Sequence, residues 1–363
     1  MNAGVAWRLG TVAVFVVVVA VIAGIVGGMV TSDEGTTAPP RGWQTIRPPH
    51  EVSALAELGG RLWVGGKDGV VALDRVSGAV VEELRPPKPL RYVRALLVDR
   101  SGVLWIGHQA GLTRWDGRTF SAFDTASGLP EARVQALLHD REGRLWVGTW
   151  GGAAVCSPGS PGSAPGGGVD LGVAAVWKQA NGLAADMVNV MLQDRRGGIW
   201  LGSSVAPRGG LSYLAPGSGL RGRPQLFTVA NGLPHNNVTC LLEARDGSVW
   251  AGTGFVDLGG AARFVLGGDG RWRLAETLGT ARGLAGAKVR SMYQDSTGAL
   301  WFGSEYDGVA RMSESGANVF TSKQGLAHNE VQAMLQDSAG NLWLGTFNGV
   351  TRLSADAVVH AQR

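Results

Sequence analysis

One short pattern recurs seven times in this chain of 363 residues. The pattern is Gly-x-apolar-Trp-x-Gly, and the spacing of its tryptophans ranges from 41 residues (Trp105 to Trp146) to 54 residues (Trp146 to Trp200). Repetition at this period is typical of solenoids, propellers and arrays, in which each repeat buries its apolar face against the next. The tryptophans of the pattern are Trp63, Trp105, Trp146, Trp200, Trp250, Trp301 and Trp343.

Each copy predicts two β-strands joined by a tight turn. Residues 134–139 and 145–149 are short apolar runs, whose length suits strands rather than helices. Asp140 and Gly143 lie at the first and fourth positions of the turn between them, where a side-chain acceptor and a left-handed residue are favoured. Shorter β-runs follow, such as 111–115 and 225–228. Four strands in each of seven units predict an all-β fold, a seven-bladed β-propeller of four-stranded blades over residues 42–363.

Further positions align when residues are counted back from each tryptophan. Aspartate lies six residues before it in five copies, with Glu57 and Ala244 at that position in the other two. A valine lies twelve residues before it in six copies, and a Gly-Leu pair lies eighteen residues before it in five. We expect the tryptophans to fill the spaces between blades, each removing about 150–250 Å² from water. We expect the glycine two residues after each tryptophan to leave room for the indole.

The N-terminal region predicts a membrane anchor. Residues 11–30 carry no charged side chain and are long enough to span a bilayer as a helix. Arg8 precedes this run and Asp33 and Glu34 follow it, so the positive-inside rule predicts a single-pass protein with an exported (periplasmic or extracellular) propeller. The predicted parts are a short cytosolic N-terminus (1–10), a transmembrane signal anchor (11–30) and a linker (31–41). The alternative is a signal peptide cleaved near Ser32, although apolar regions of such peptides usually span about 7–15 residues.

The ends of the chain indicate how the ring closes. Only 20 residues follow Trp343, enough for a third strand but barely for a fourth. Residues 42–46 form a β-like run with no partner nearby in sequence, and we predict that they supply the outer strand of the seventh blade, which hides both sheet edges. Residues 357–360 are the alternative. Cys156 and Cys240 fall in blades that are not neighbours, so no disulfide is expected between them.

Aligned in this way, the repeat resembles the two-component regulator propeller repeat, whose pattern is close to Asp-x-x-Gly-x-Leu-Trp-x-Gly-Thr-x-x-Gly-Leu. Residues 99–112, 140–152 and 337–350 carry the resemblance. It implies a propeller of the kind found as the extracellular sensor region of membrane histidine kinases and hybrid regulators, with recognition of ligands such as glycans. No kinase, receiver or helix-turn-helix pattern accompanies the repeats, and ten cytosolic residues are too few for an output domain.

Positions at which the copies differ are the candidates for function. Segments that follow each Trp-x-Gly, and segments that precede each first strand, are expected at one end of the blades. Aromatic rings with amides and carboxylates around a shallow funnel suit a polar ligand such as a sugar or a peptide. The candidate ligand-binding or partner-binding residues are His108, Trp150, Arg208, Asp257, Glu305, Tyr306, Asp307, Phe347, Asn348, His235 and His328.

No pattern of catalytic, metal-binding or cofactor-binding residues is evident. His235 and His328 occupy equivalent positions and could ligate a metal or act as acid and base, but no third ligand at suggestive spacing accompanies them. The repeated aspartates are single acids in turns, without the clustered oxygen ligands that Ca²⁺ takes. The net charge of +4 is spread over the chain without a basic run, so nucleic acid is not indicated as a partner.

The sequence therefore predicts a non-catalytic binding or scaffold propeller, which senses a ligand for a partner protein or stabilises a membrane complex. The expected partners are a membrane-embedded or periplasmic protein, a small polar or glycan ligand, and the lipid bilayer through residues 11–30. The alternative is a periplasmic lyase or hydrolase that acts on glycans. Two histidines and an acid pointing into the central channel would favour the enzyme.

Overall fold

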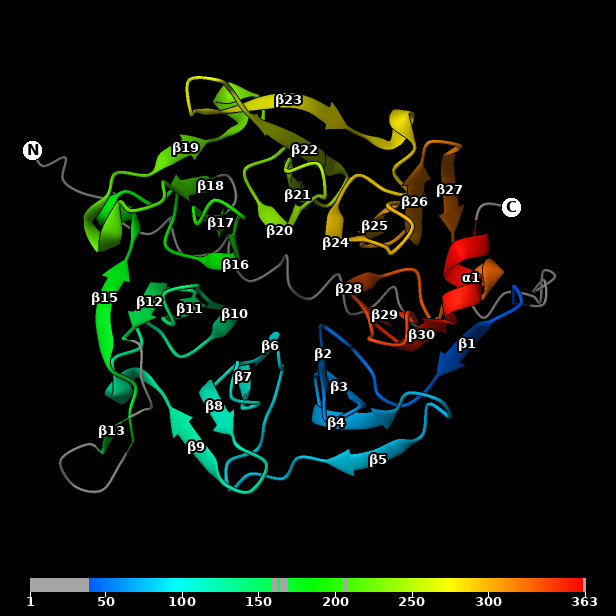
Figure 1. Ribbon diagram of the computed structural model, residues 1–363, viewed down its shortest axis with the longest axis horizontal. Coiled ribbons are helices and arrows are strands. Elements are labelled where there is room, and N and C mark those ends of the chain that lie inside the picture. Colours follow the sequence, from blue (N-terminus) through cyan, green and yellow to red (C-terminus); the bar gives the residue numbers. More distant parts are fainter. Residues whose placement is uncertain (1–38, 158–161, 164–168, 206–207, 362–363) are drawn as a thin grey trace, which may run out of the picture. The chain divides into compact units, whose positions relative to one another are not determined.

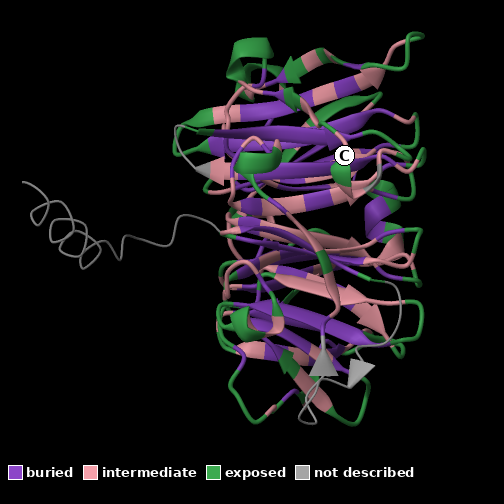
Figure 2. Ribbon diagram, turned by 90° about the vertical axis from the view of Figure 1, so that its left-hand side faces the viewer, coloured by how far each residue is buried: buried purple, intermediate pink, exposed green. Residues whose placement is uncertain are grey.

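The computed structural model describes residues 39–157, 162–163, 169–205 and 208–361. In this part of the chain seven antiparallel four-stranded sheets surround a central space, and a two-stranded hairpin lies apart from them (Figure 1). Buried residues follow the strands and exposed residues gather in the loops (Figure 2). The predicted all-β, seven-bladed propeller of four-stranded blades is confirmed.

The first two strands of each blade come from the tryptophan repeat. The first strands lie nearest the centre and are β2 (Ala54–Leu58), β6 (Ala95–Val98), β10 (Val134–His139), β16 (Val188–Gln193), β20 (Val238–Glu243), β24 (Val289–Gln294) and β28 (Val331–Gln336). The second strands are β3 (Arg61–Gly66), β7 (Leu104–His108), β11 (Leu145–Thr149), β17 (Ile199–Val205), β21 (Val249–Phe255), β25 (Leu300–Ser304) and β29 (Leu342–Thr346).

The outer half of each blade varies more in length. The third strands are β4 (Gly69–Asp74), β8 (Gly111–Trp115), β12 (Gly152–Cys156), β18 (Arg208–Leu214), β22 (Leu258–Leu266), β26 (Val309–Ser313) and β30 (Gly349–Leu353). The outermost strands are β5 (Val80–Glu83), β9 (Phe120–Phe123), β15 (Val173–Trp177), β19 (Gln225–Phe227), β23 (Trp272–Leu278), β27 (Gly316–Phe320) and β1 (Trp43–Ile46). The extra hairpin pairs β13 (Gly162–Ser163) with β14 (Val169–Asp170).

The repeated aspartate holds the tryptophan of its own blade. Trp146 Nε1 donates to Asp140 Oδ2 at 2.7 Å, and the backbone N–H of Arg144 donates to Asp140 Oδ1 at 2.8 Å. An indole N–H buried without an acceptor costs about 1–3 kcal/mol, so this bond fixes both the turn and the ring. All seven repeat tryptophans are buried. The same bond joins Asp99 to Trp105, Asp194 to Trp200, Asp295 to Trp301 and Asp337 to Trp343.

The glycine two residues after each tryptophan makes room for the next blade, not for the indole. A Cβ placed on Gly148 would lie 3.0 Å from Cγ1 of Val188, and one placed on Gly345 would lie 2.6 Å from Cγ1 of Val52. A valine of the following blade occupies this place at every boundary between blades, with the valine backbone making the contact at Gly303. Our expectation about the indole was wrong because the glycine backbone is the point of closest approach between blades.

A second contact between blades changes the interpretation of Glu57. Backbone N–H groups in the turns donate to the last side chain of the next first strand, as from Arg245 to Gln294 at 2.7 Å and from Ser296 to Gln336 at 2.8 Å. Glu57 accepts from the Ser338 N–H at 2.7 Å in the same way. The hairpin of the first blade pairs Glu57 with Leu62 and is one residue shorter than the others, so Glu57 is a contact between blades and not a variant of the turn aspartate.

The N-terminal strand closes the ring. β1 pairs with β30, with Trp43 opposite Leu353 and Ile46 opposite Val350. Residues 355–360, which include the whole alternative closing segment, form the helix α1 (Ala355–His360). Cys156 and Cys240 are buried and form no disulfide. The predicted closure by residues 42–46 is therefore confirmed.

The predicted anchor lies outside the described residues. Residues 1–10, the apolar run 11–30 and most of the linker 31–41 fall there. Where the structure does describe the chain, no helix combines the length and the apolar character that a bilayer span requires.

Restoring the repeat in the fifth blade should stabilise the protein. Ala244 replaces the turn aspartate there, so no carboxylate at this position can accept from Trp250 Nε1. We expect Ala244→Asp to raise the free energy of unfolding by about 1 kcal/mol, measured by urea denaturation. Asp140→Ala is the matched control and should lower it by about 2–3 kcal/mol. A loss of stability in Ala244→Asp would show that the bond from aspartate to indole does not control this turn.

Removing the closing strand should open the ring. Deletion of residues 42–46 exposes the edge of β30 and removes Trp43 and Ile46 from the core, so the free energy of unfolding should fall by several kcal/mol. Deletion of residues 31–36, in the predicted linker, is the control and should leave the denaturation midpoint unchanged. Equal midpoints for the two deletions would contradict this assignment.

Candidate functional site

The two ends of the propeller differ in construction. We call the end with the hairpins between second and third strands, and with the connections between blades, the loop face. The opposite end carries the aspartate turns, and we call it the turn face. All eleven candidate residues lie in segments of the loop face, because each is in or next to one of those hairpins or connections. Their exposure differs, and they do not form one continuous site.

His108 is buried and does not face a ligand. Its Nε2 lies 3.0 Å from Thr113 Oγ1, and its Nδ1 accepts the Ala110 N–H at 3.2 Å. In other blades a threonine makes the corresponding hydrogen bonds. Thr149 Oγ1, for example, accepts from the Gly151 N–H and donates to the Gly152 carbonyl. Burial lowers the pKa of His108 to about 4. The ring therefore supports its hairpin, which corrects the prediction that it lines the funnel.

His235 and His328 have equivalent local structures in separate blades. The Nδ1 of His235 accepts the Asn237 N–H at 2.9 Å, and the Nδ1 of His328 accepts the Glu330 N–H at 3.0 Å. Each ring also packs against a phenylalanine of its own blade, with centroids 6.4 Å apart for Phe255 and 5.4 Å apart for Phe347. Burial lowers the pKa of both histidines, and a nearby cation adds to this. The two histidines belong to the fifth and seventh blades and share no ligand position.

The carboxylates of the sixth and seventh blades belong to an ion-pair network. Glu305 lies 2.6 Å from Lys288 Nζ and 3.6 Å from Arg290 Nη1, and Glu330 lies 3.0 Å from Arg290 Nη2. Burial raises the pKa of Glu330, while the charge of Glu305 is the main cause that raises the pKa of Tyr306. The negative charges of Glu305 and Glu330 equal the positive charges of Lys288 and Arg290. Glu305 is therefore neutralised by side chains of the protein itself.

Exposed aromatic rings mark the hairpin tips of the loop face. Trp150 is 40% exposed, Phe255 50%, Tyr306 58% and Phe347 43%. They occur in the third, fifth, sixth and seventh blades. The guanidinium of Arg133 lies 3.9 Å from the centre of the Trp150 ring and covers one of its faces. Phe255 belongs with this set, because it lies at the end of β21 beside the hairpin tip.

The remaining candidates are polar and vary in exposure. Arg208, Asp257 and Asp307 are exposed, and Asp307 Oδ2 lies 3.2 Å from Ser304 Oγ at its hairpin. Asn348 is half-buried, because its Oδ1 lies 2.8 Å from His50 Nδ1 and its carbonyl accepts from Arg47.

Five of the connections between blades share one local structure. They begin with a 3₁₀ turn that ends at a glycine with positive φ, such as Gly128 at 93°. The leucine after each glycine is buried, which accounts for the Gly-Leu pairs. These turns are η1 (Thr125–Ser127), η2 (Gln179–Asn181), η4 (Val229–Asn231), η5 (Thr280–Arg282) and η6 (Ser322–Gln324). A further turn, η3 (Gly219–Arg221), precedes β19.

Sequence reasoning missed a ring of polar side chains at the centre. One residue from each blade lines a cavity of about 150 Å³ in the channel. Each follows the valine that packs on the neighbouring glycine, and in five blades it falls in a β-bulge, which re-aims a side chain away from the regular strand. A polar residue after that valine in every copy was the available signal. This channel ring consists of Ser53, Arg94, Gln135, Asn189, Thr239, Arg290 and Gln332.

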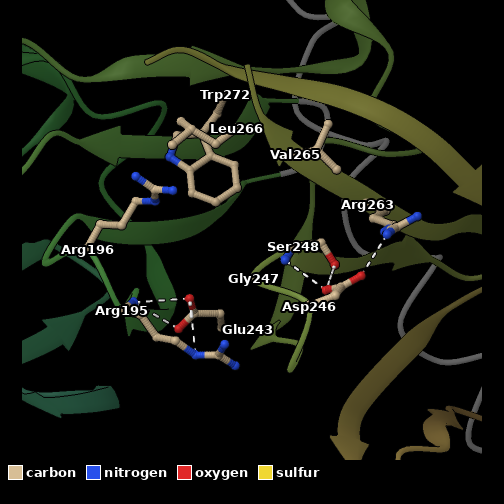
Figure 3. A pocket seen from close by; sticks show the side chains of 10 residues that line it. All are labelled: Arg195, Arg196, Glu243, Asp246, Gly247, Ser248, Arg263, Val265, Leu266 and Trp272. Carbon is tan, nitrogen blue, oxygen red and sulfur yellow. Dashed lines mark hydrogen bonds and ion pairs between the residues drawn. The ribbon is translucent and has the colours of Figure 1, made fainter. Parts of the chain in front are cut away.

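A cleft of about 470 Å³ opens on the turn face between the fourth and fifth blades (Figure 3). Arg195 donates to Glu243 and to the Ala244 carbonyl, and Arg263 pairs with Asp246 at 2.7 Å. The Arg195 contacts cross the boundary between the blades, the Arg263 pair lies within the fifth blade, and none of the candidate residues lies in the cleft. Among the residues that the structure describes, no group of three or more His, Cys, Asp or Glu side chains is placed to hold a metal ion.

Comparison with known proteins agrees with this architecture. Residues 128–151, 232–255, 283–306 and 325–348 match the family model described as two component regulator propeller. The chain carries two-component regulator propeller repeats. Each matched segment spans a connection, a first strand and the tryptophan strand, so the repeat corresponds to the constant half of a blade. No curated protein matches the sequence of the chain.

Several solved structures share the propeller fold of these repeats. The extracellular domain assigned to the hybrid two component system BT3049 from B. thetaiotaomicron has a TM-score of 0.72 at 20% identity, over 90% of this chain and 42% of that one. The extracellular domain of BT4673 from B. thetaiotaomicron has a TM-score of 0.66 at 18% identity, over 84% of this chain and 40% of that one. A streptogramin B lyase has a TM-score of 0.61 at 11% identity, over 85% of this chain and 96% of that one. The chain spans about two fifths of both extracellular-domain structures, and at these identities the likeness concerns the fold alone.

The buried His108 should make stability depend on pH. Its folded pKa of about 4 lies below the ordinary 6.5, so the unfolded chain binds the proton first as pH falls. The stabilisation is complete above about pH 6.5 and is lost progressively toward pH 4, by about 1–3 kcal/mol. His108→Thr introduces the threonine that other blades carry at this position. It should remove the loss of stability that protonation of His108 causes. Urea denaturation at pH 7 and pH 4.5 tests it, and identical losses in both proteins would exclude His108 as the cause.

Proposed function

We propose that the protein is a non-catalytic binding propeller, exported and anchored in the membrane through residues 11–30, whose loop face recognises a partner protein or a polar ligand. The observation that carries this proposal is the set of exposed rings at the hairpin tips: Trp150, Phe255, Tyr306 and Phe347. Aromatic side chains dominate the binding energy at protein interfaces, because they contribute large contact areas at a small cost in conformational entropy.

The scaffold beneath these rings suits recognition. The rings lie at the tips of β-hairpins whose strands pair within the blade, so they are presented by elements that do not need to order on binding. A rigid surface loses little conformational freedom when a partner binds. The loop face also combines the rings with charged residues such as Arg208 and Asp257, as expected for an apolar centre with a polar rim.

The placement of the titratable groups supports a binding role over the enzyme alternative. Glu305 and Glu330 are bound to Lys288 and Arg290, and the Nδ1 atoms of His235 and His328 accept backbone N–H groups. The channel ring contains neither histidine nor carboxylate. A glycan lyase or hydrolase needs an acid and a base that act on the same substrate, and Glu305 and Glu330 are instead paired with cations of the protein.

The relatives support the cellular setting of this proposal. The repeats are of the two-component regulator type, and two similar solved structures are extracellular domains. An uncharged run of 20 residues ahead of the propeller provides the anchor. The partner is then a membrane-embedded or periplasmic protein, or a glycan, that meets the propeller outside the membrane.

Substitution of two loop-face rings should abolish recognition without unfolding the protein. Tagged full-length protein, cross-linked in its own membranes, would be purified and its bound species quantified by mass spectrometry. We expect the double variant Tyr306→Ala, Phe347→Ala to recover at least tenfold less of the partner or ligand that is cross-linked to the parent protein, since two aromatic anchors are lost. Val81→Ala with Leu226→Ala is the matched control, because these exposed apolar residues lie on outer strands. Equal recovery from both double variants would refute the proposal, and glycan turnover by the parent protein would favour the enzyme.

A further inference from the structure

The channel ring divides into structural and unpartnered members. Ser53 donates to the Val93 carbonyl and Thr239 to the Val289 carbonyl, each in the next blade. Asn189 Nδ2 donates to the Val238 carbonyl at 3.2 Å in the same way. These three side chains join neighbouring blades, so the fold alone accounts for them.

Three of the other members have no such structural role, and the fourth, Arg290, is held by its ion pairs with Glu305 and Glu330. Within the described residues, the side chains of Arg94, Gln135 and Gln332 make no hydrogen bond and no ion pair. All three line the same small cavity of about 150 Å³. They present a guanidinium and two amides, which together offer several N–H donors directed at one space.

Of the two arginines in the channel ring, only Arg94 has no carboxylate paired with it. Arg290, the other cation of the ring, is neutralised in the network with Glu330, Glu305 and Lys288. Arg94 has no carboxylate of its own. Its side chain is exposed to the channel but protein surrounds much of it, and this burial, with the charge of Arg290 second, lowers the pKa of Arg94.

An arginine in this position is costly for folding. A partly desolvated guanidinium with no carboxylate in contact loses hydration, and the more distant charges of Glu51 and Glu330 offset this loss only in part. Five of the seven blades carry a neutral polar residue at the same position, so the ring closes without arginine. Residues that burden the fold in this way are typical of functional sites.

The channel beyond the ring is apolar on one side. A second cavity of about 260 Å³ shares Arg94 and Gln135 with the first and is also lined by Ala136, Met191 and Met292. A ligand that fits both has an anionic head at the ring and a small apolar body beyond it. Small-molecule sites commonly combine an apolar lining with a few placed polar groups.

We propose that the channel ring binds a small organic carboxylate. Arg94 forms the ion pair with the carboxylate, in the bidentate geometry that guanidinium groups favour. Gln135 and Gln332 donate amide N–H groups to the same oxygens, and the body of the ligand packs toward Met191 and Met292. This site is separate from the aromatic rings of the loop face and does not depend on them.

Calorimetry with simple probes on full-length protein tests the proposal. Benzoate and butyrate should bind, benzoate at least tenfold more tightly than its neutral analogue benzamide, because only the carboxylate pairs with Arg94. Arg94→Gln should weaken benzoate binding at least tenfold. Arg91→Gln is the matched control, since Arg91 is exposed in the same connection and should leave binding unchanged. Equal binding of benzoate and benzamide, equal binding by Arg94→Gln, or binding of inorganic phosphate in preference to carboxylates would overturn it.

Thermal denaturation gives an independent readout. In buffer free of carboxylates, Arg94→Gln should melt at the same temperature as the parent or higher, because the uncompensated charge is removed. Benzoate should raise the melting temperature of the parent and of Arg91→Gln but not that of Arg94→Gln, since a ligand that binds only the folded state stabilises it. A lower melting temperature for Arg94→Gln without ligand would show that Arg94 serves the fold and would refute the assignment.

Discussion

The contact between a valine and a glycine at each boundary between blades is the constraint on which this propeller depends. The first strands converge on the centre, where neighbouring blades have the least space. A valine there packs directly on a backbone without a Cβ, as Val188 does on Gly148. Any larger residue would increase the separation of two blades, and seven such increases would have to be absorbed around one closed ring. Regular spacing at the centre therefore requires glycine in every copy.

The two ends of the blades differ in freedom for a related reason. At the turn face, one aspartate satisfies turn N–H groups and a buried indole together, so few other residues serve there. At the loop face, the connections are held mainly by their own 3₁₀ turns and leucines. The hairpin tips beyond those turns carry little structural duty. Trp150 and Phe347 therefore occupy equivalent places, and Tyr306 a nearby one in a longer hairpin, without disturbing the ring.

The sequence predicted the architecture because its strongest signal is periodic. Seven tryptophans fixed the number of blades, and the shortage of residues after Trp343 indicated closure by residues 42–46. Finer assignments failed where they depended on register. Counting from Trp63 aligned Glu57 with an aspartate, although a shorter hairpin places it against Ser338. The channel ring was missed because strand periodicity does not show that the residue after each valine faces the centre. In five blades a β-bulge turns this residue inward, and Ser53 and Arg94 lie just ahead of their first strands.

Closure by the N-terminal strand also determines at what stage of synthesis the propeller can finish folding. Trp43 is among the first propeller residues to be synthesised and Leu353 among the last, yet they pair directly. During synthesis β1 has no partner, while each intermediate blade can pack on the one made just before it. The final folding event must join the two ends of the domain, and contacts so distant in sequence form slowly. A chain released before residue 349 would keep two open sheet edges, which is the condition that invites aggregation and recognition by quality-control proteases.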